Sequence, residues 1–171
     1  MACAAAIMRV DGPCECTPPA PYGANGNAFQ GRLPCGMFEY RCQLRVRYAE
    51  TDRMGYVYYG AYAGFLEVAR VEALRSLGLS YRAMEDEGVM LPVHDLSLRY
   101  HKPAFYDDLL TITTRVAAPP SVRIAFDYTV HNEQGDALTD ASTTLVFIDR
   151  ATGRPCRAPR RLLDVFAPYF P

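Results

Sequence analysis

Two adjacent stretches with different periods constrain the fold of this chain more than any other feature of its sequence. From Phe38 to Tyr48 apolar and polar residues alternate strictly, which predicts a strand with one buried face. From Tyr62 to Leu77 the apolar residues follow helical spacing and cover most of the circumference, which predicts a largely enclosed helix. Gly78 is the residue expected to end this helix.

Beyond the helix the sequence predicts a short helical piece over residues 80–87 and then strands only. The four further strands are expected over residues 89–101, 109–118, 122–131 and 138–148, with one register slip in the last. A final short helix is expected over residues 160–167. One long helix with five antiparallel strands predicts an α+β fold. We expect the sheet to curl and wrap the central helix, since so apolar a helix needs cover on more than one side.

The N-terminal segment differs in composition from the rest of the chain. Five prolines and five glycines interrupt residues 1–36, and no apolar period survives there. We therefore expect a flexible tail, followed by a domain over residues 37–171. Five of the six cysteines lie within the first 42 residues, and residues 45–150 contain none. This distribution argues against a disulfide-held core and favours reduced thiols in a cytoplasmic protein.

Composition and the absence of common motifs exclude several classes of function. A net charge of −1 gives no case for nucleic-acid binding. No apolar run approaches the ~18 residues that a membrane span requires. The sequence contains no cysteine–histidine spacing typical of zinc and no glycine-rich phosphate loop, so we expect neither a metal nor a cofactor. It also lacks the Gly-x-Ser-x-Gly elbow of α/β-hydrolase esterases.

The loop between the first strand and the helix carries the residues best suited to chemistry. No Ser, Thr, Asp or Asn stands before the helix as a cap. The backbone amides near Tyr59, Gly60 and Ala61 are then free to polarise a carbonyl or to stabilise an oxyanion. The alternative is that Gly60 caps the helix through its own backbone and that water meets the remaining amides.

Asp52 lies seven residues before Tyr59, in a loop that Gly55 allows to turn sharply. Its carboxylate could attack a carbonyl carbon or act as a general base on water. An Asx turn that only holds the loop is the alternative. Glu50 competes for the catalytic role, and strand parity does not decide between the two carboxylates.

The loop and the helix carry the pattern Thr51-Asp52-x-x-Gly55-x-Val57-x-Tyr59-x-x-Tyr62, followed by Phe65-Leu66-Glu67-x-Ala69-Arg70. In this pattern the chain resembles the hotdog-fold acyl-CoA thioesterases of the 4-hydroxybenzoyl-CoA thioesterase type. The resemblance extends from Phe38 to about Arg150. The chain departs from the family at two positions, since many bacterial members carry His at the position of Tyr59 and Ala61 replaces a common Asn.

The resemblance implies a hotdog fold and the hydrolysis of an acyl-CoA thioester. It also implies a homodimer or homotetramer whose sites lie at the subunit interface. Asp52 falls on the catalytic aspartate of the family, and the backbone N–H of Tyr59 falls on the oxyanion donor. Substrate-binding roles are expected for four nearby residues, although core packing explains the tyrosines about as well. These residues are Gly55, Tyr58, Gly60 and Tyr62.

Two other functions stay open at the level of sequence. A hotdog module could bind an acyl thioester without cleaving it, which Asp52 disfavours because a binder needs no carboxylate beside a thioester. A thioesterase could instead act on acyl groups held by acyl carrier protein, with the segment from Arg154 to Arg161 as its docking patch. The cluster of C-terminal arginines could also hold the phosphates of CoA or form a solvated face. The cluster consists of Arg150, Arg154, Arg157, Arg160 and Arg161.

Overall fold

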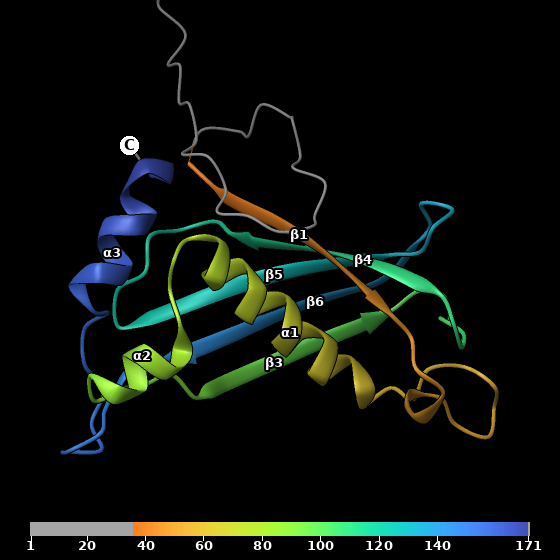
Figure 1. Ribbon diagram of the computed structural model, residues 1–171, viewed down its shortest axis with the longest axis horizontal. Coiled ribbons are helices and arrows are strands. Elements are labelled where there is room, and N and C mark those ends of the chain that lie inside the picture. Colours follow the sequence, from red (N-terminus) through yellow and green to blue (C-terminus); the bar gives the residue numbers. More distant parts are fainter. Residues whose placement is uncertain (1–35, 171) are drawn as a thin grey trace, which may run out of the picture.

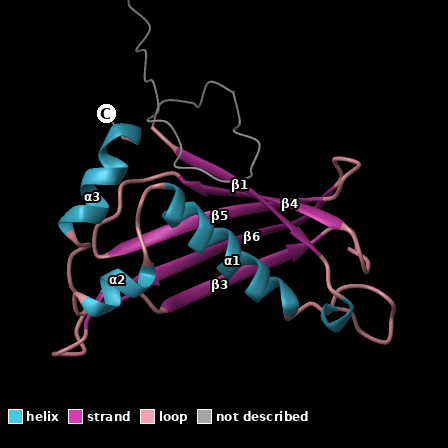
Figure 2. Ribbon diagram, viewed as in Figure 1, coloured by secondary structure: helices cyan, strands magenta, loops and turns pink. Residues whose placement is uncertain are grey.

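The structure is a computed structural model that describes residues 36–170. The tail expected over residues 1–36 therefore lies outside the described residues, except for its last residue. Five antiparallel strands form one sheet in the order β1-β4-β5-β6-β3, and helix α1 (Ala61–Ser76) lies across one face of it (Figures 1 and 2). The strands are β1 (Phe38–Arg45), β3 (Val93–Tyr100), β4 (Leu109–Val116), β5 (Arg123–His131) and β6 (Ala137–Val146).

The alternation in the sequence is what gives the sheet its buried face. Along β5, buried and exposed residues alternate, and the register places Ile112 of β4 between Cys42 of β1 and Val130 of β5. These inward side chains meet the buried face of α1, where Phe65 and Leu66 are almost fully enclosed. Each large apolar side chain buried in this way contributes about 1.5–3 kcal/mol, so the contact holds α1 on the sheet.

The α+β class is confirmed, but the expected wrapping of the helix is wrong. The sheet is open, with β1 and β3 as its two edges, and α1 packs against one face only (Figure 1). The prediction rested on an apolar arc that covers most of the circumference of the helix. Its outer side instead presents two small residues, Ala63 and Gly64, together with Glu67 and a single exposed valine, Val68. Such a face tolerates water.

Several shorter elements refine the sequence prediction. The strand expected over residues 89–101 is divided into β2 (Val89–Met90) and β3, because Pro92 lies between them and has no N–H to donate. β2 pairs with β7 (Ile148–Asp149) in a separate two-stranded sheet. The remaining elements lie close to their predicted positions: α2 (Tyr81–Asp86), α3 (Arg160–Phe166) and the 3-10 turn η2 (Ala167–Tyr169).

The edge strand β3 exposes apolar side chains. Val93, Leu96 and Tyr100 are 47%, 41% and 45% exposed, and within residues 36–170 only one side of β3 is paired. An exposed apolar edge of this kind is a template for pairing with another chain. Among the same residues, no helix has both the length and the apolar character needed to cross a membrane.

The two ends of the sheet carry different elements (Figure 1). The start of α1 and the loop before it lie at one end, where β3 finishes. Helices α2 and α3 and the turn after β7 lie at the other end, where β3 begins. The residues predicted to carry chemistry are therefore gathered at a single end.

Candidate active site

The loop that carries Asp52 folds back on itself as a narrow antiparallel arm. The strand expected to reach Tyr48 ends at Arg45, and a 3-10 turn, η1 (Tyr48–Glu50), follows it. Residues 50–52 then run beside residues 56–58, with the Asp52 N–H donating to the Tyr56 carbonyl at 3.0 Å. The second side of the arm leads directly into α1, so this pairing places Asp52 beside the chain that starts the helix.

Gly55 closes the tip of this arm. Its φ of +85° lies in the left-handed region, which residues with a Cβ adopt only with strain. The Gly55 N–H donates to the Asp52 carbonyl at 3.0 Å. On its other side the arm is held by a neighbouring loop, because the Val57 N–H donates to the carbonyl of the fully buried Ala104 at 2.8 Å. The loop is therefore anchored at its tip and along one flank.

One carboxylate oxygen of Asp52 holds the turn, and the other is available. Oδ1 accepts the Met54 N–H at 2.8 Å, which is the Asx turn considered from sequence. Among residues 36–170 no donor is bonded to Oδ2, and the side chain is half-buried. The Asx turn is thus confirmed, and it orients the carboxylate while leaving one oxygen for a substrate or a water molecule.

Glu50, the competing carboxylate, is occupied by structural contacts. Its Oε2 accepts the Arg47 N–H at 2.7 Å, and its Oε1 accepts the Arg47 Nε–H at 2.8 Å and a second guanidinium N–H. The residue is only 9% exposed. This bonding raises the pKa of the Arg47 guanidinium, which stays charged. Glu50 therefore holds η1 in place, and Asp52 is the carboxylate of this loop with a free oxygen.

Helix α1 begins without a side-chain cap, as predicted. Gly60 is the N-cap residue, and no side chain among residues 36–170 caps the first turn. The expectation that the Ala61 amide is free is wrong, because it donates to the Tyr58 carbonyl at 2.9 Å. The N–H groups of Tyr59 and Gly60 make no hydrogen bond within the described part of the chain. They present two donors at the positive end of the helix dipole.

Tyr58 and Tyr59 stand beside these donors. Their ring centroids are 4.4 Å apart with the rings tilted by 46°, and they are 45% and 63% exposed. The hydroxyl of Tyr59 raises the pKa of Tyr58 by hydrogen bonding, and the negative charge of Asp52 adds to this effect.

Tyr62 is a core residue and not an open wall of the site. It is 2% exposed, and its ring packs edge-on against Phe65 at 5.6 Å and Tyr100 at 5.2 Å. Burial raises the pKa of its phenol. Core packing, the alternative weighed from sequence, therefore accounts for where Tyr62 lies.

Tyr100 reaches the site from β3 and was missed by the sequence analysis. Its hydroxyl donates to the Tyr59 carbonyl at 3.0 Å. Because a peptide unit is planar and rigid, this bond also fixes the Gly60 N–H, which belongs to the same peptide. The signal available in the sequence was parity, since Tyr100 shares its strand face with Leu96 and Leu98.

The C-terminal arginines lie far from Asp52 within one protomer. Arg150 and Arg154 flank the turn after β7, and Arg160 and Arg161 begin α3, at the end of the sheet opposite to the start of α1 (Figure 1). Arg161 donates to the Gly78 carbonyl at 3.2 Å. A single copy of the chain therefore does not bring this cluster and the carboxylate together.

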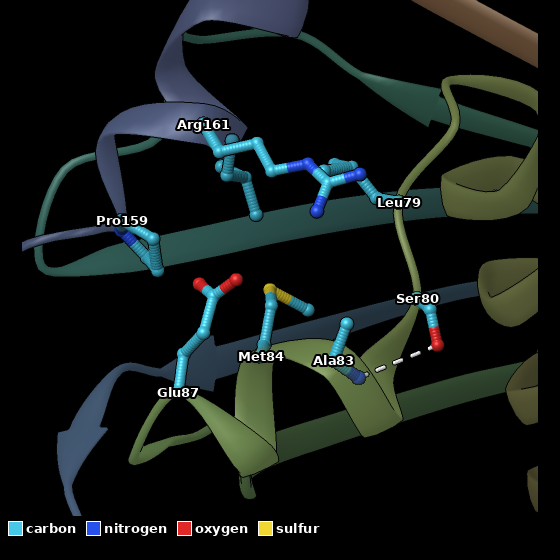
Figure 3. A pocket seen from close by; sticks show the side chains of 8 residues that line it. Leu79, Ser80, Ala83, Met84, Glu87, Pro159 and Arg161 are labelled. Carbon is cyan, nitrogen blue, oxygen red and sulfur yellow. Dashed lines mark hydrogen bonds between the residues drawn. The ribbon is translucent and has the colours of Figure 1, made fainter.

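A small hollow between α2 and α3 is also separate from this site. Figure 3 shows Glu87, Met84 and Ala83 on one wall and Arg161 with Leu79 on the facing one. None of the loop residues around Asp52 lines it. Among the described residues there is also no group of three or more side chains suited to bind a metal ion.

Comparisons with known proteins agree with this geometry. The family model described as the thioesterase-like superfamily matches residues 46–166. The chain is 30% identical over 127 residues to the putative acyl-CoA thioesterase YneP of Bacillus subtilis, a match that covers 74% of this chain and 92% of that protein. It is 31% identical over 127 residues to the acyl-CoA thioester hydrolase YbgC of Escherichia coli O157:H7, covering 74% and 95%.

Solved structures show the same likeness. The DHNA-CoA thioesterase from Staphylococcus aureus superposes with a TM-score of 0.71 at 37% sequence identity, covering 77% of this chain and 88% of that chain. The hypothetical protein TT1821 from Thermus thermophilus also superposes with a TM-score of 0.71, at 34% identity over 75% and 98%. These superpositions confirm the hotdog fold expected from the resemblance.

Proposed function

The chain belongs to the thioesterase-like superfamily, and from this premise we propose that it is a thioester hydrolase that cleaves an acyl-CoA to the free acid and CoA. One observation supports the proposal most strongly. Oδ2 of Asp52 and the N–H groups of Tyr59 and Gly60, which have no hydrogen-bond partner within residues 36–170, occur at the same end of the sheet, on one continuous loop. The names of the relatives above as acyl-CoA thioesterases agree with this chemistry.

The two backbone donors serve the carbonyl oxygen. A thioester oxygen at the start of α1 accepts hydrogen bonds from Tyr59 and Gly60, and these bonds strengthen as negative charge develops on it. Removing one such donor typically costs on the order of 10²–10³ in kcat. Backbone donors of this kind need no particular side chain at position 59, so the tyrosine found there is compatible with the role.

Asp52 serves the carbonyl carbon by one of two routes. As a general base, it takes a proton from water while the water oxygen attacks; the C–S bond breaks, and the proton then passes to the CoA thiolate. As a nucleophile, Oδ2 attacks directly, the CoA thiolate leaves, and water hydrolyses the resulting anhydride. Both routes need one free carboxylate oxygen held in a fixed direction, and the Asx turn of Asp52 provides that.

The working form that we propose is a homodimer paired along β3. Pairing two β3 edges buries the exposed Val93, Leu96 and Tyr100 and joins the two sheets into one. An antiparallel pairing also exchanges the ends of the sheet. The arginine cluster of the second copy then lies toward the Asp52 end of the first, where guanidinium groups suit the phosphates of CoA. A sedimentation-equilibrium mass of a single 19.1 kDa chain would contradict this assembly.

The activity is tested with a panel of aliphatic and aromatic acyl-CoAs while the release of free thiol is followed. We expect hydrolysis of at least one of them, and a loss of at least ~10²-fold in kcat for Asp52→Asn. The amide oxygen of Asn accepts the same Met54 N–H, so the turn persists. Asp108→Asn is the matched control, because Asp108 Oδ2 likewise accepts a backbone N–H, from Phe105 at 2.8 Å, outside the loop that carries Asp52.

The outcomes separate the possible functions. Equal rates for the wild type and Asp52→Asn would remove Asp52 from the mechanism. Binding of acyl-CoA without turnover would favour the non-catalytic module. Hydrolysis of acyl groups on acyl carrier protein alone would favour the carrier-protein thioesterase.

A further inference from the structure

The ring of Tyr58 lies against Gly60, the residue that carries one of the two donors. A Cβ built on Gly60 would stand 2.5 Å from Cε1 and 3.2 Å from Cδ1 of Tyr58, so the ring occupies the space that a side chain at position 60 would fill. Cβ atoms in a helix are tilted toward its N-terminus, the end toward which the first N–H groups point. The ring therefore lies beside the path by which a carbonyl oxygen reaches the Gly60 N–H.

The ring can leave this position without disturbing the loop. The backbone of Tyr58 is held on both sides, since its N–H donates to the Glu50 carbonyl at 2.8 Å and its carbonyl accepts the Ala61 N–H at 2.9 Å. The side chain is 45% exposed, with the Tyr59 ring as its aromatic neighbour. Exposed side chains change rotamer on the ps–ns timescale. A swing of the ring is therefore faster than any turnover.

We propose that Tyr58 is a lid over the helix start that the acyl group displaces, and that it selects among acyl groups. This inference rests on the proposed function. With the site empty, the ring covers the unpaired N–H of Gly60. With the thioester oxygen seated there, the ring turns aside and packs against the acyl carbons next to the carbonyl. Acyl groups that are branched at that carbon meet the ring, whereas linear ones pass beside it.

Two substitutions that remove the lid in different ways test the selection. Tyr58→Ala deletes the ring. Gly60→Ala pushes it aside, because the new Cβ would overlap Cε1, while the φ of −69° and ψ of −21° at this position suit alanine. We expect either substitution to raise kcat/KM for pivaloyl-CoA relative to butanoyl-CoA by about 2–12-fold, the size of one aromatic packing contact.

The double variant provides the sharper result. If Gly60→Ala acts only by moving the ring, it has no effect on the selectivity ratio once Tyr58→Ala has removed that ring. The double variant then matches Tyr58→Ala. Additive changes in the ratio, or single variants with the wild-type ratio, would overturn the proposal.

A binding measurement tests the movement without turnover. The chain contains no tryptophan, so Tyr58→Trp in the Asp52→Asn background places a single tryptophan on the lid. Tyr48→Trp in the same background is the control, because Tyr48 is 78% exposed and rests on Tyr106 instead of the helix start. Butanoyl-CoA is expected to shift the emission and the acrylamide quenching of Trp at position 58 and to leave those at position 48 unchanged.

The two levels of inference fail in different ways. Unchanged emission at position 58, with butanoyl-CoA binding verified by calorimetry, would refute the lid while leaving hydrolysis intact. No hydrolysis of any acyl-CoA by the wild type would refute the proposed function itself.

Discussion

Replacing Tyr100 with phenylalanine removes a single hydroxyl and isolates what it contributes to the site. The ring contact with Tyr62 at 5.2 Å is kept, whereas the 3.0 Å hydrogen bond to the Tyr59 carbonyl is lost. A bond on a carbonyl strengthens the N–H of the same peptide by about 10–30%. Since one oxyanion donor contributes about 2.7–4 kcal/mol to catalysis, the Gly60 N–H loses about 0.3–1.2 kcal/mol of transition-state stabilisation.

This loss corresponds to an about 2–8-fold lower kcat. KM should change little, because the effect grows with the charge on the oxygen and is small in the ground state. The free energy of unfolding should fall by about 0.5–1.5 kcal/mol, the net contribution of one hydrogen bond.

The assay compares thiol release at saturating acyl-CoA and urea unfolding for the wild type and Tyr100→Phe. Tyr106→Phe is the matched control, since Tyr106 is a 58% exposed tyrosine at the same end of the sheet and its hydroxyl has no hydrogen-bond partner within residues 36–170. A wild-type kcat for Tyr100→Phe, or a change confined to KM, would refute the argument that this hydroxyl orients the Gly60 peptide.

Two further predictions concern stability. Gly55→Ala should lower the free energy of unfolding by about 1–2 kcal/mol, because φ is +85° at this position. Gly64→Ala should raise it by about 0.5–1 kcal/mol, because Gly64 lies in helix α1 with open space around it. Urea unfolding that gives both changes the same sign would contradict this reasoning. Burial raises the pKa of the Cys42 thiol from 9.0 to about 11. Stability should therefore be full below pH 9 and decline toward pH 11, with a slope of at most about 1.4 kcal/mol per pH unit. Denaturation between pH 9 and pH 11 should show a shallower decline for Cys42→Ala.

Periodicity predicted the elements whose position depends on burial alone. The helix expected over 62–77 occupies Ala61–Ser76, and the strand expected over 122–131 occupies Arg123–His131. Both depend on a repeating apolar face that has only one way to meet the core. The strand expected over 89–101 was divided because Pro92 interrupts pairing, an effect that alternation does not encode. The wrapping of the helix was wrong because it depends on the shape of the whole sheet.

The sequence was sufficient to predict the location of the candidate site but not its hydrogen bonds. Sequence placed Asp52 near an uncapped helix start, and the structure shows both the loop and the missing side-chain cap. The choice between Asp52 and Glu50 depends on the hydrogen bond from the Arg47 guanidinium to Glu50. The direction of that guanidinium is set by the turn η1 and cannot be read from the alternation of the strand. The Ala61 amide was wrongly expected to be free. Its acceptor is the Tyr58 carbonyl, and the direction of that carbonyl depends on the path of the loop, which residue types alone do not give.

Tyr100 is the last residue of β3, the strand whose outer edge we propose to be shared between two copies. Its hydroxyl also steadies the peptide that carries one of the two donors. Tyr100 thus links the association of the subunits to the orientation of the Gly60 N–H. Dilution of the enzyme below its dissociation constant should therefore lower the turnover number itself, and not only the number of complete sites.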